Sequence, residues 1–128
     1  MVTKQKDCIF CNIPLEDILF EDDYSVVIRD KFPVTPLHSL VIPKRHVSDY
    51  FELNEAEILS VNNNLRILRE SILESDNAVQ GFNIGVNSGA VAGQTVFHCH
   101  IHLIPRREGD VDNPRGGVRH LIPGKGVY

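Results

Sequence analysis

The sequence predicts an α+β fold with a mainly antiparallel sheet. Four or five short segments have the apolar, β-branched composition or the alternation of strands, and turn residues separate them. A single long segment with helical periodicity lies between them, so strands and helices do not alternate along the chain as in a parallel α/β sheet. The length suits one domain and no linker or internal repeat is visible, so we expect residues 1–128 to form a single domain.

Before the helix, the chain contains a short helical turn and three candidate strands. The turn is expected over 13–17 and the strands over 19–22, 25–30 and 39–44, of which the first is the weakest. Proline cannot donate a hydrogen bond to a neighbouring strand, so Pro43 should lie at a sheet edge or at a strand end.

The long helix has the clearest pattern. Asn54 and Glu57 have the spacing of a capping box, which predicts that the helix begins after Asn54. The helix should end near Asp76 and Asn77. Its apolar residues recur at helical spacing and should form one buried stripe: Ile58, Val61, Leu65, Leu68 and Ile72.

After the helix, two strands are expected around a small-residue loop. Residues 81–87 alternate, residues 87–93 are rich in Gly and Ala, and residues 95–105 form the strongest strand candidate. The tail, about 108–128, contains many Gly and Pro residues and is expected to be loop-like. The apolar side chains of the first strand should share one side: Phe82, Ile84 and Val86.

Composition excludes several classes of protein. The net charge of -4 and the pI near 5.8 argue against a nucleic-acid binder, which usually carries a basic surface. No apolar run of about 18 residues predicts a membrane helix, and the first residues do not resemble a secretory signal. Three cysteines do not suggest a disulfide framework, so we expect a reducing, cytoplasmic location.

Three of the six histidines alternate within five residues of the last strand: His98, His100 and His102. In a strand these three side chains share one face, and Cys99 with its apolar neighbours faces the core. A row of imidazoles on a solvated face is unusual for a strand. Two functional interpretations remain, a metal site and a nucleophilic imidazole, because histidine serves both purposes near neutral pH.

The loop before this strand favours the nucleophile. Backbone N–H groups of a small, Gly-rich loop can approach the oxygens of a phosphate closely, and Gln94 and Thr95 add hydrogen-bond donors. No carboxylate interrupts the histidine row, which weakens the case for a catalytic metal centre. The pattern therefore favours attack on a phosphorus atom.

The segment HCHIHLI fits the motif His-φ-His-φ-His-φ-φ, where φ is apolar, and thereby resembles the histidine triad (HIT) family. The resemblance extends through AGQTVF, PRREGD and RDKFPVTPLHSLVIPKRH, and covers about residues 8–107. It is closest in pattern to bacterial-type members and to dinucleoside polyphosphate hydrolases. It implies a HIT-like α+β fold with a mainly antiparallel five-stranded sheet, one long and one short helix, and a homodimer.

The resemblance also implies roles for individual residues. His100 should attack the α-phosphorus of a nucleotide and form a covalent nucleotidyl-histidine, which water hydrolyses. His102 should contact the phosphate and the leaving group, and His98 should orient His100. Substrate contacts are implied for five further residues: Asp30 at the ribose, Asn87 and Gly93 at the phosphate, and Gln94 and Thr95 at the phosphate or the leaving side.

For four residues, both a functional and a structural interpretation remain open. His38 matches a histidine common in the family, and a structural hydrogen bond between loops competes with a functional role. Arg106 and Arg107 could neutralise a polyphosphate, although solvation or pairing in a dimer fits equally well. Asp30 could be a solvated carboxylate at a strand end.

The pair Cys8 and Cys11 could form a redox site or half of a zinc site. No thioredoxin-like setting surrounds it. Zinc requires four ligands, and the resemblance implies His46 and His98 as the other two. Such a zinc would be structural, because all its ligands come from protein. The alternative is two packed cysteines and an exposed His46, and no organic cofactor is expected.

The leading hypothesis is a hydrolase that acts at the α-phosphate of a dinucleoside polyphosphate such as diadenosine tetraphosphate. The run AGQTV before the triad resembles that branch, whereas the CIFC start resembles phosphoramidase-like members. A purine nucleoside phosphoramidase is therefore the first alternative. The others are a non-catalytic nucleotide sensor and a metal-dependent hydrolase with the triad as ligands. In each case the partner is a small nucleotide, and neither nucleic acid nor a membrane is expected.

Overall fold

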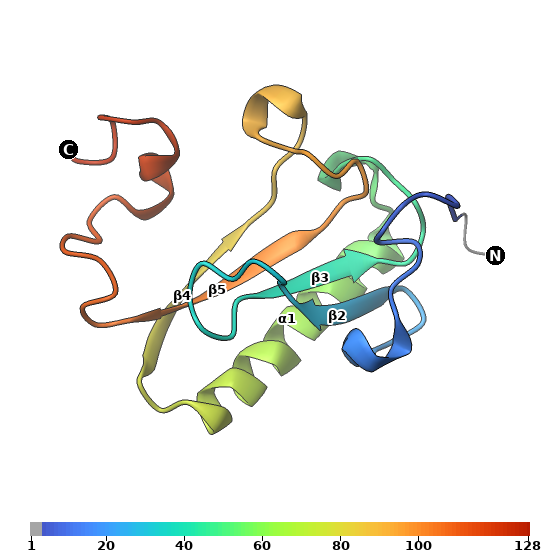
Figure 1. Ribbon diagram of the computed structural model, residues 1–128, viewed down its shortest axis with the longest axis horizontal. Coiled ribbons are helices and arrows are strands. Elements are labelled where there is room, and N and C mark those ends of the chain that lie inside the picture. Colours follow the sequence, from blue (N-terminus) through green and yellow to red (C-terminus); the bar gives the residue numbers. More distant parts are fainter. Residues whose placement is uncertain (1–3) are drawn as a thin grey trace.

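The computed structural model describes residues 4–128, so part of the N-terminal segment considered above as a signal lies outside the described residues. Five strands form one sheet, and one long helix covers part of one face (Figure 1). The elements in chain order are η1 (Leu15–Asp17), β1 (Ile18–Glu21), β2 (Ser25–Arg29), β3 (Ser39–Pro43), η2 (Tyr50–Glu52), α1 (Glu55–Ser75), β4 (Val79–Gly85), η3 (Ala90–Ala92), β5 (Ile101–Arg107) and η4 (Gly117–Leu121).

The sheet has the order β1-β2-β3-β5-β4, and every neighbouring pair is antiparallel. The predicted fold class is confirmed. The last strand, β5, inserts between β3 and β4, so that His102 pairs with Leu40 on one side and Gly85 on the other. The third triad histidine therefore lies on an inner strand, where the sheet holds its backbone on both sides.

Helix α1 begins and ends where the sequence predicts. Asn54 accepts a hydrogen bond from the Glu57 amide at 2.9 Å, and the Glu57 carboxylate accepts one from the Asn54 amide at 2.9 Å. The predicted apolar stripe is wrong at its first residue, because Ile58 is 41% exposed. Glu57 takes the buried position instead, and Arg45 compensates its charge through contacts of 2.8 and 2.9 Å. That ion pair lowers the pKa of the Glu57 carboxyl.

Each face of the sheet packs against a different partner. Helix α1 covers one face and forms the main core with residues such as Val41, Leu68 and Leu103. On the other face, Phe10 and Ile13 from the N-terminal segment pack against a smaller apolar cluster of β2 and β3. The N-terminal segment therefore covers the face opposite α1.

The predicted strand over 95–105 is wrong at its start, because β5 begins at Ile101. The preceding residues bond to loops instead of to a neighbouring strand. The Gln94 amide donates to the carbonyls of Ser48 and Val96, and the Cys99 N–H donates to the carbonyl of Val47. His98 and His100 thus lie outside the strand, although Cys99 faces the core as expected.

Two smaller corrections concern the end of the chain and the edge of the sheet. Strand β4 begins and ends two residues earlier than predicted, and Ile84 on it is 56% exposed, whereas Phe82 packs against the main core. The tail contains the short helix η4 within otherwise irregular chain and extends away from the sheet (Figure 1). Within residues 4–128, no helix has the length and apolar character needed to span a bilayer.

Candidate active site

A cavity of about 630 Å³ lies where the N-terminal segment, the loop before β3, the small-residue loop and the triad meet. One part of its wall is apolar and includes Phe10, Ile28 and Leu40. The structure brings most of the predicted substrate and triad residues to this wall: Asp30, Asn87, Gly93, Thr95, His100 and His102. The cavity is large enough for a small-molecule ligand.

His98 is fully buried, and its hydrogen bonds identify its tautomer. Nε2 lies 2.7 Å from the Pro43 carbonyl oxygen, which can only accept, so Nε2 carries the proton. Burial lowers the pKa of His98 and keeps the ring neutral. Its Nδ1 therefore presents a lone pair, and it points to the cluster of Cys8, Cys11 and His46 rather than into the cavity.

His100 is oriented by the main chain of His98. The His100 Nδ1 lies 2.8 Å from the His98 carbonyl oxygen and must donate a proton to it. In the neutral ring, Nε2 is then left with a free lone pair. The Phe10 ring packs against this imidazole with a centroid separation of 4.9 Å. The His98 carbonyl can therefore perform the orienting role expected of this residue, while the His98 ring faces the two cysteines and His46.

A chain of hydrogen bonds gives His102 the opposite tautomer. The Val34 N–H donates to His38 Nδ1 at 3.1 Å, so the proton of neutral His38 lies on Nε2. That Nε2 lies 2.9 Å from His102 Nδ1, which must accept, and His102 therefore carries its proton on Nε2. Asp30 lies close by, with a carboxylate oxygen 3.4 Å from His38 Nε2.

Desolvation determines the charge state of this pair. Burial, with smaller contributions from the neighbouring His100 and His38, lowers the pKa of His102 to about 4. Burial also lowers the pKa of His38, although Asp30 opposes this shift. Both rings are neutral near pH 7, so His102 can donate a hydrogen bond from Nε2 without carrying a positive charge.

Two adjacent residues at the end of the small-residue loop, Gly93 and Gln94, have different roles in the site. Gly93 lines the cavity with a φ of 96°, a left-handed conformation that glycine adopts without strain. Gln94 is buried, and besides its two bonds to main-chain carbonyls it accepts one from the Gly89 N–H at 2.8 Å. The whole Gln94 amide therefore braces the loop, and Gln94 is absent from the cavity wall formed by the described residues.

The predicted metal ligands lie together. The ligand atoms of Cys8, Cys11, His46 and His98 all lie within 4.8 Å of one another. Four separations between a sulfur or nitrogen atom and an Nδ1 atom in this cluster are 3.2 to 3.5 Å. Tetrahedral zinc with S and N ligands gives separations of about 3.3–3.6 Å, so the four residues fit a zinc ion. The unprotonated His98 Nδ1 is the atom that a metal requires.

The triad does not form one metal site. Among residues 4–128, the other potential ligand group is Asp30 with His38 and His102. Neither group contains His98, His100 and His102 together. The interpretation of the triad as three ligands of a catalytic metal therefore lacks geometric support.

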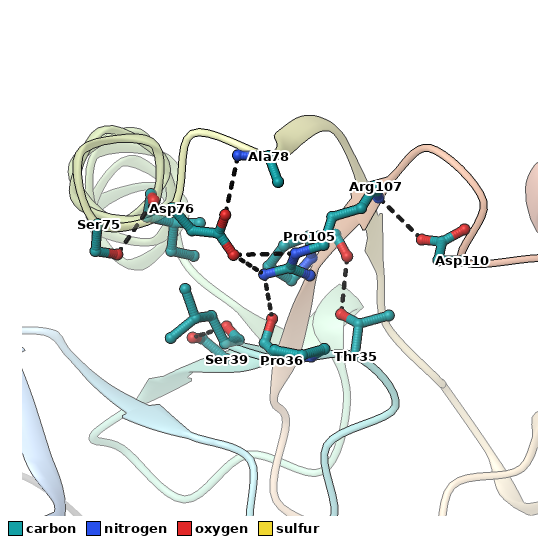
Figure 2. Close-up of polar contacts among 11 residues, drawn as sticks. Thr35, Pro36, Ser39, Ser75, Asp76, Ala78, Pro105, Arg107 and Asp110 are labelled. Atoms are coloured by element: carbon teal, nitrogen blue, oxygen red, sulfur yellow. Dashed lines mark hydrogen bonds and ion pairs between the residues drawn. The ribbon is translucent and has the colours of Figure 1, made fainter.

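Both arginines after the triad are already paired. Arg106 makes two contacts with Asp110 at 2.8 and 2.9 Å and donates to Asn83 at 2.7 Å. Arg107 binds Asp76 at 2.8 and 3.1 Å, as Figure 2 shows. A second cavity of about 500 Å³ touches His38 and His102 and is lined by Arg106 and by apolar residues of β4, β5 and the tail.

Sequence reasoning missed two contributors to the site. Phe10 packs against His98 and His100, and its position between Cys8 and Cys11 is the one signal that could have indicated it. The main-chain amide of Val34 sets the tautomers of the histidine pair, and no side-chain pattern encodes it.

Comparison with known proteins agrees with this geometry. The family model of the HIT domain matches residues 14–109. The chain belongs to the HIT family. It is 38% identical over 112 residues to adenylylsulfatase HINT3 of Arabidopsis thaliana, covering 84% of this chain. The chain spans only 56% of the length of that plant protein.

Two solved structures resemble this HIT protein over most of its length. A Zn-bound histidine triad family protein from Mycobacterium smegmatis has a TM-score of 0.72 and 36% identity, covering 81% of this chain and 78% of the other. Diadenosine triphosphate hydrolase of Plasmodium falciparum, in complex with Cyclomarin A, has a TM-score of 0.72 and 29% identity, covering 79% and 68%. Binding or hydrolysis of nucleotides is therefore the activity class of this family.

The shifted pKa of His102 predicts acid sensitivity of the fold. Between pH 6.5 and about 4 the unfolded chain binds a proton at this residue and the folded protein does not, so the free energy of unfolding decreases as the pH falls. His102 should account for about 2 kcal/mol of the loss between pH 7 and 5. Urea unfolding of the wild type and His102→Asn at both pH values measures this difference. Equal losses in the two proteins would contradict the prediction.

Proposed function

We propose that this HIT protein hydrolyses the bond between the α-phosphate of a nucleotide and its leaving group, through a covalent intermediate on His100. One observation carries the proposal. In the neutral ring of His100 the lone pair is on Nε2, whereas His102 carries its proton on Nε2, and both rings line the same cavity with centroids 5.3 Å apart. Their Nδ1 atoms are engaged elsewhere, so Nε2 is the nitrogen that each presents to a ligand.

The two tautomers suit a displacement in two steps. His100 Nε2 attacks the α-phosphorus, so that a P–N bond forms and the bond to the leaving group breaks. His102 Nε2–H donates a hydrogen bond to the phosphate or to the departing atom, and the leaving group takes up a proton from solvent. Water then attacks phosphorus and gives up a proton to solvent, a P–O bond forms, the P–N bond breaks, and His100 is regenerated. Neutral His102 donates throughout because its pKa is far below 7.

The remaining cavity residues would bind the nucleotide. Asp30 is proposed to accept hydrogen bonds from the ribose hydroxyls, and the apolar wall with Phe10 and Ile28 suits a purine base. Asn87 and Thr95 would contact phosphate oxygens, and Gly93 lets the backbone approach them. The contribution proposed for Gln94 is indirect, since its hydrogen bonds hold the loop that carries these residues: Asn87, Gly93 and Thr95.

Two substrate classes, which differ in their leaving groups, are candidates. The first is a dinucleoside polyphosphate such as diadenosine tetraphosphate, which follows from the sequence motif, and the Plasmodium falciparum relative is named for hydrolysis of the related diadenosine triphosphate. A specific observation favours the second candidate, a purine nucleoside phosphoramidate. Arg106 and Arg107, the cations nearest the triad in sequence, are paired with carboxylates, and the second cavity beside His102 is largely apolar. An uncharged amine leaving group suits such a wall better than a polyphosphate does.

A turnover assay with His100→Asn tests the covalent step. Wild type should release AMP from diadenosine tetraphosphate or from an adenosine phosphoramidate and carry a transient AMP adduct, visible by mass spectrometry. Loss of the nucleophile should lower turnover on the order of 10⁴-fold or more and abolish the adduct, while folding persists. The faster substrate identifies the leaving group. AMP binding without turnover in wild type would reject the enzyme and favour a nucleotide sensor.

We also propose that Cys8, Cys11, His46 and His98 hold a structural zinc ion. The support is the fit of their separations to tetrahedral zinc and the Zn-bound relative from Mycobacterium smegmatis. The bound ion would anchor the N-terminal segment, with Phe10, against the triad. The thiols must remain reduced for this purpose, which agrees with a cytoplasmic location.

The zinc site predicts a contrast between two cysteines. Cys11→Ser should lose stoichiometric zinc and unfold at a lower temperature, because metal binding contributes to the free energy of folding. Cys99→Ser should retain the metal, since Cys99 lies in the main core. Elemental analysis of the purified proteins with thermal unfolding measures both effects. Retention of zinc by Cys11→Ser would exclude this ligand set.

A homodimer is the assembly that we propose. Strand β4 is at one edge of the sheet, where one side of its backbone has no partner strand within the described chain. A groove between α1 and β4 adds a surface on which apolar residues such as Leu65, Phe82 and Ile84 lie beside charged ones such as Arg66 and Glu70. Sedimentation equilibrium should give the mass of two chains, and Ile84→Lys should shift it toward one. A wild-type monomer at micromolar concentration would contradict the proposal.

A further inference from the structure

The turn formed by residues 35–38 precedes β3 and carries His38 to the triad. The His38 N–H donates to the Thr35 carbonyl at 3.1 Å, and Pro36 occupies the second position of the turn. Leu37 at the third position has a φ of 71°, and within residues 4–128 it is the one non-glycine residue with a positive φ. Turns with this geometry usually contain glycine or asparagine there, because a side chain is strained.

Contacts from outside the turn hold this strained conformation. The Pro36 carbonyl accepts a hydrogen bond from Arg107 Nη2 at 3.1 Å, and the Leu37 carbonyl accepts one from Ser39 Oγ at 2.7 Å. The Thr35 hydroxyl donates to the Pro105 carbonyl at 2.8 Å. Strain of this kind persists where the surroundings over-determine the backbone, and it is concentrated at functional sites.

Arg107 is the connection between the turn and the helix. Figure 2 shows its guanidinium between Asp76, at the end of α1, and Pro36 in the turn. The side chain of Arg107 is 16% exposed and that of Asp76 is 29% exposed. Asp76 is itself held, because one of its carboxylate oxygens accepts from the Ala78 N–H at 2.9 Å. The ion pair lowers the pKa of Asp76, which stays charged near neutral pH.

We propose that Arg107 is a positioning residue for the triad: through Asp76 and Pro36 it holds the strained turn that aims His38 Nε2 at His102. The inference rests on the proposed function. His102 donates to the substrate from Nε2 only while its Nδ1 accepts from His38. Loosening of the turn breaks that contact and lets His102 populate both tautomers, one of which presents a lone pair to the phosphate. Arg107 thus acts on the reaction without touching the substrate.

The test compares Arg107→Gln with the wild-type chain in two measurements. Nitrogen-15 NMR of the histidine rings reports the His102 tautomer in the absence of substrate. Wild type should show a single tautomer with the proton on Nε2, and Arg107→Gln should show a mixture. Turnover should fall about 10- to 100-fold in kcat, as expected for misplacement of a catalytic group, with KM unchanged.

A rescue separates positioning from general stability. Glycine adopts a positive φ without strain, so Leu37→Gly in the Arg107→Gln background should restore the single tautomer and most of kcat. Ile72→Val is the matched control, because it removes a buried methylene from the same end of α1 and the Ile72 side chain takes no part in the hydrogen bonds of the turn. It should lower the unfolding temperature and leave both tautomer and kcat unchanged.

Three outcomes are decisive. A single His102 tautomer and full kcat in Arg107→Gln, with only a lower unfolding temperature, would make Arg107 purely structural and overturn the inference. If Arg107→Gln does not fold, Asp76→Asn decides in the same way, because it weakens the same ion pair. If wild type turns over no nucleotide, the proposed function fails while the NMR measurement still decides whether Arg107 sets the tautomer.

Discussion

The hydrogen bond between His98 Nε2 and the Pro43 carbonyl is the contact on which the rest of the site depends. It joins the end of β3 to the segment before β5 in the buried centre of the molecule. Because it places the proton on Nε2, it leaves Nδ1 as a lone pair directed at the two cysteines and His46. The same residue offers its carbonyl to His100. One histidine thus connects the metal-ligating cluster to the nucleophile.

The three triad histidines differ in tautomer although they differ little in sequence context. His98 and His102 carry the proton on Nε2, whereas His100 carries it on Nδ1, and each assignment follows from a main-chain group that can only donate or only accept. A lone pair and a proton therefore face the same cavity from adjacent rings. One residue type thus supplies both a hydrogen-bond donor and a lone pair to the cavity, because the hydrogen-bond partners of each ring decide which of its nitrogens carries the proton.

Much of the site could be predicted from local pattern. The four predicted metal ligands lie together in the fold: Cys8, Cys11, His46 and His98. Of the seven residues expected to contact the substrate, six line one cavity. Gln94 differs, because its side-chain amide donates to the carbonyls of Ser48 and Val96 instead. The strand expected over 95–105 failed for a related reason. Its first half bonds to the 43–48 region, and alternation in sequence does not reveal which partner a backbone segment will find.

The sequence by itself determined the α+β class, the helix with its cap, the triad and the family. These features depend on periodicity and on motifs of residues close together in the chain, where local geometry leaves few alternatives. Only the tertiary structure decided the tautomers, the burial of Gln94, the pairing of both arginines and the strained conformation of Leu37. Most of these depend on a partner distant in sequence, such as Pro43 for His98, Ser48 for Gln94 and Asp76 for Arg107, whereas Arg106 pairs with Asp110 four residues on. The distant partners are often main-chain carbonyls or amides, and such groups are identical at nearly every position of the chain.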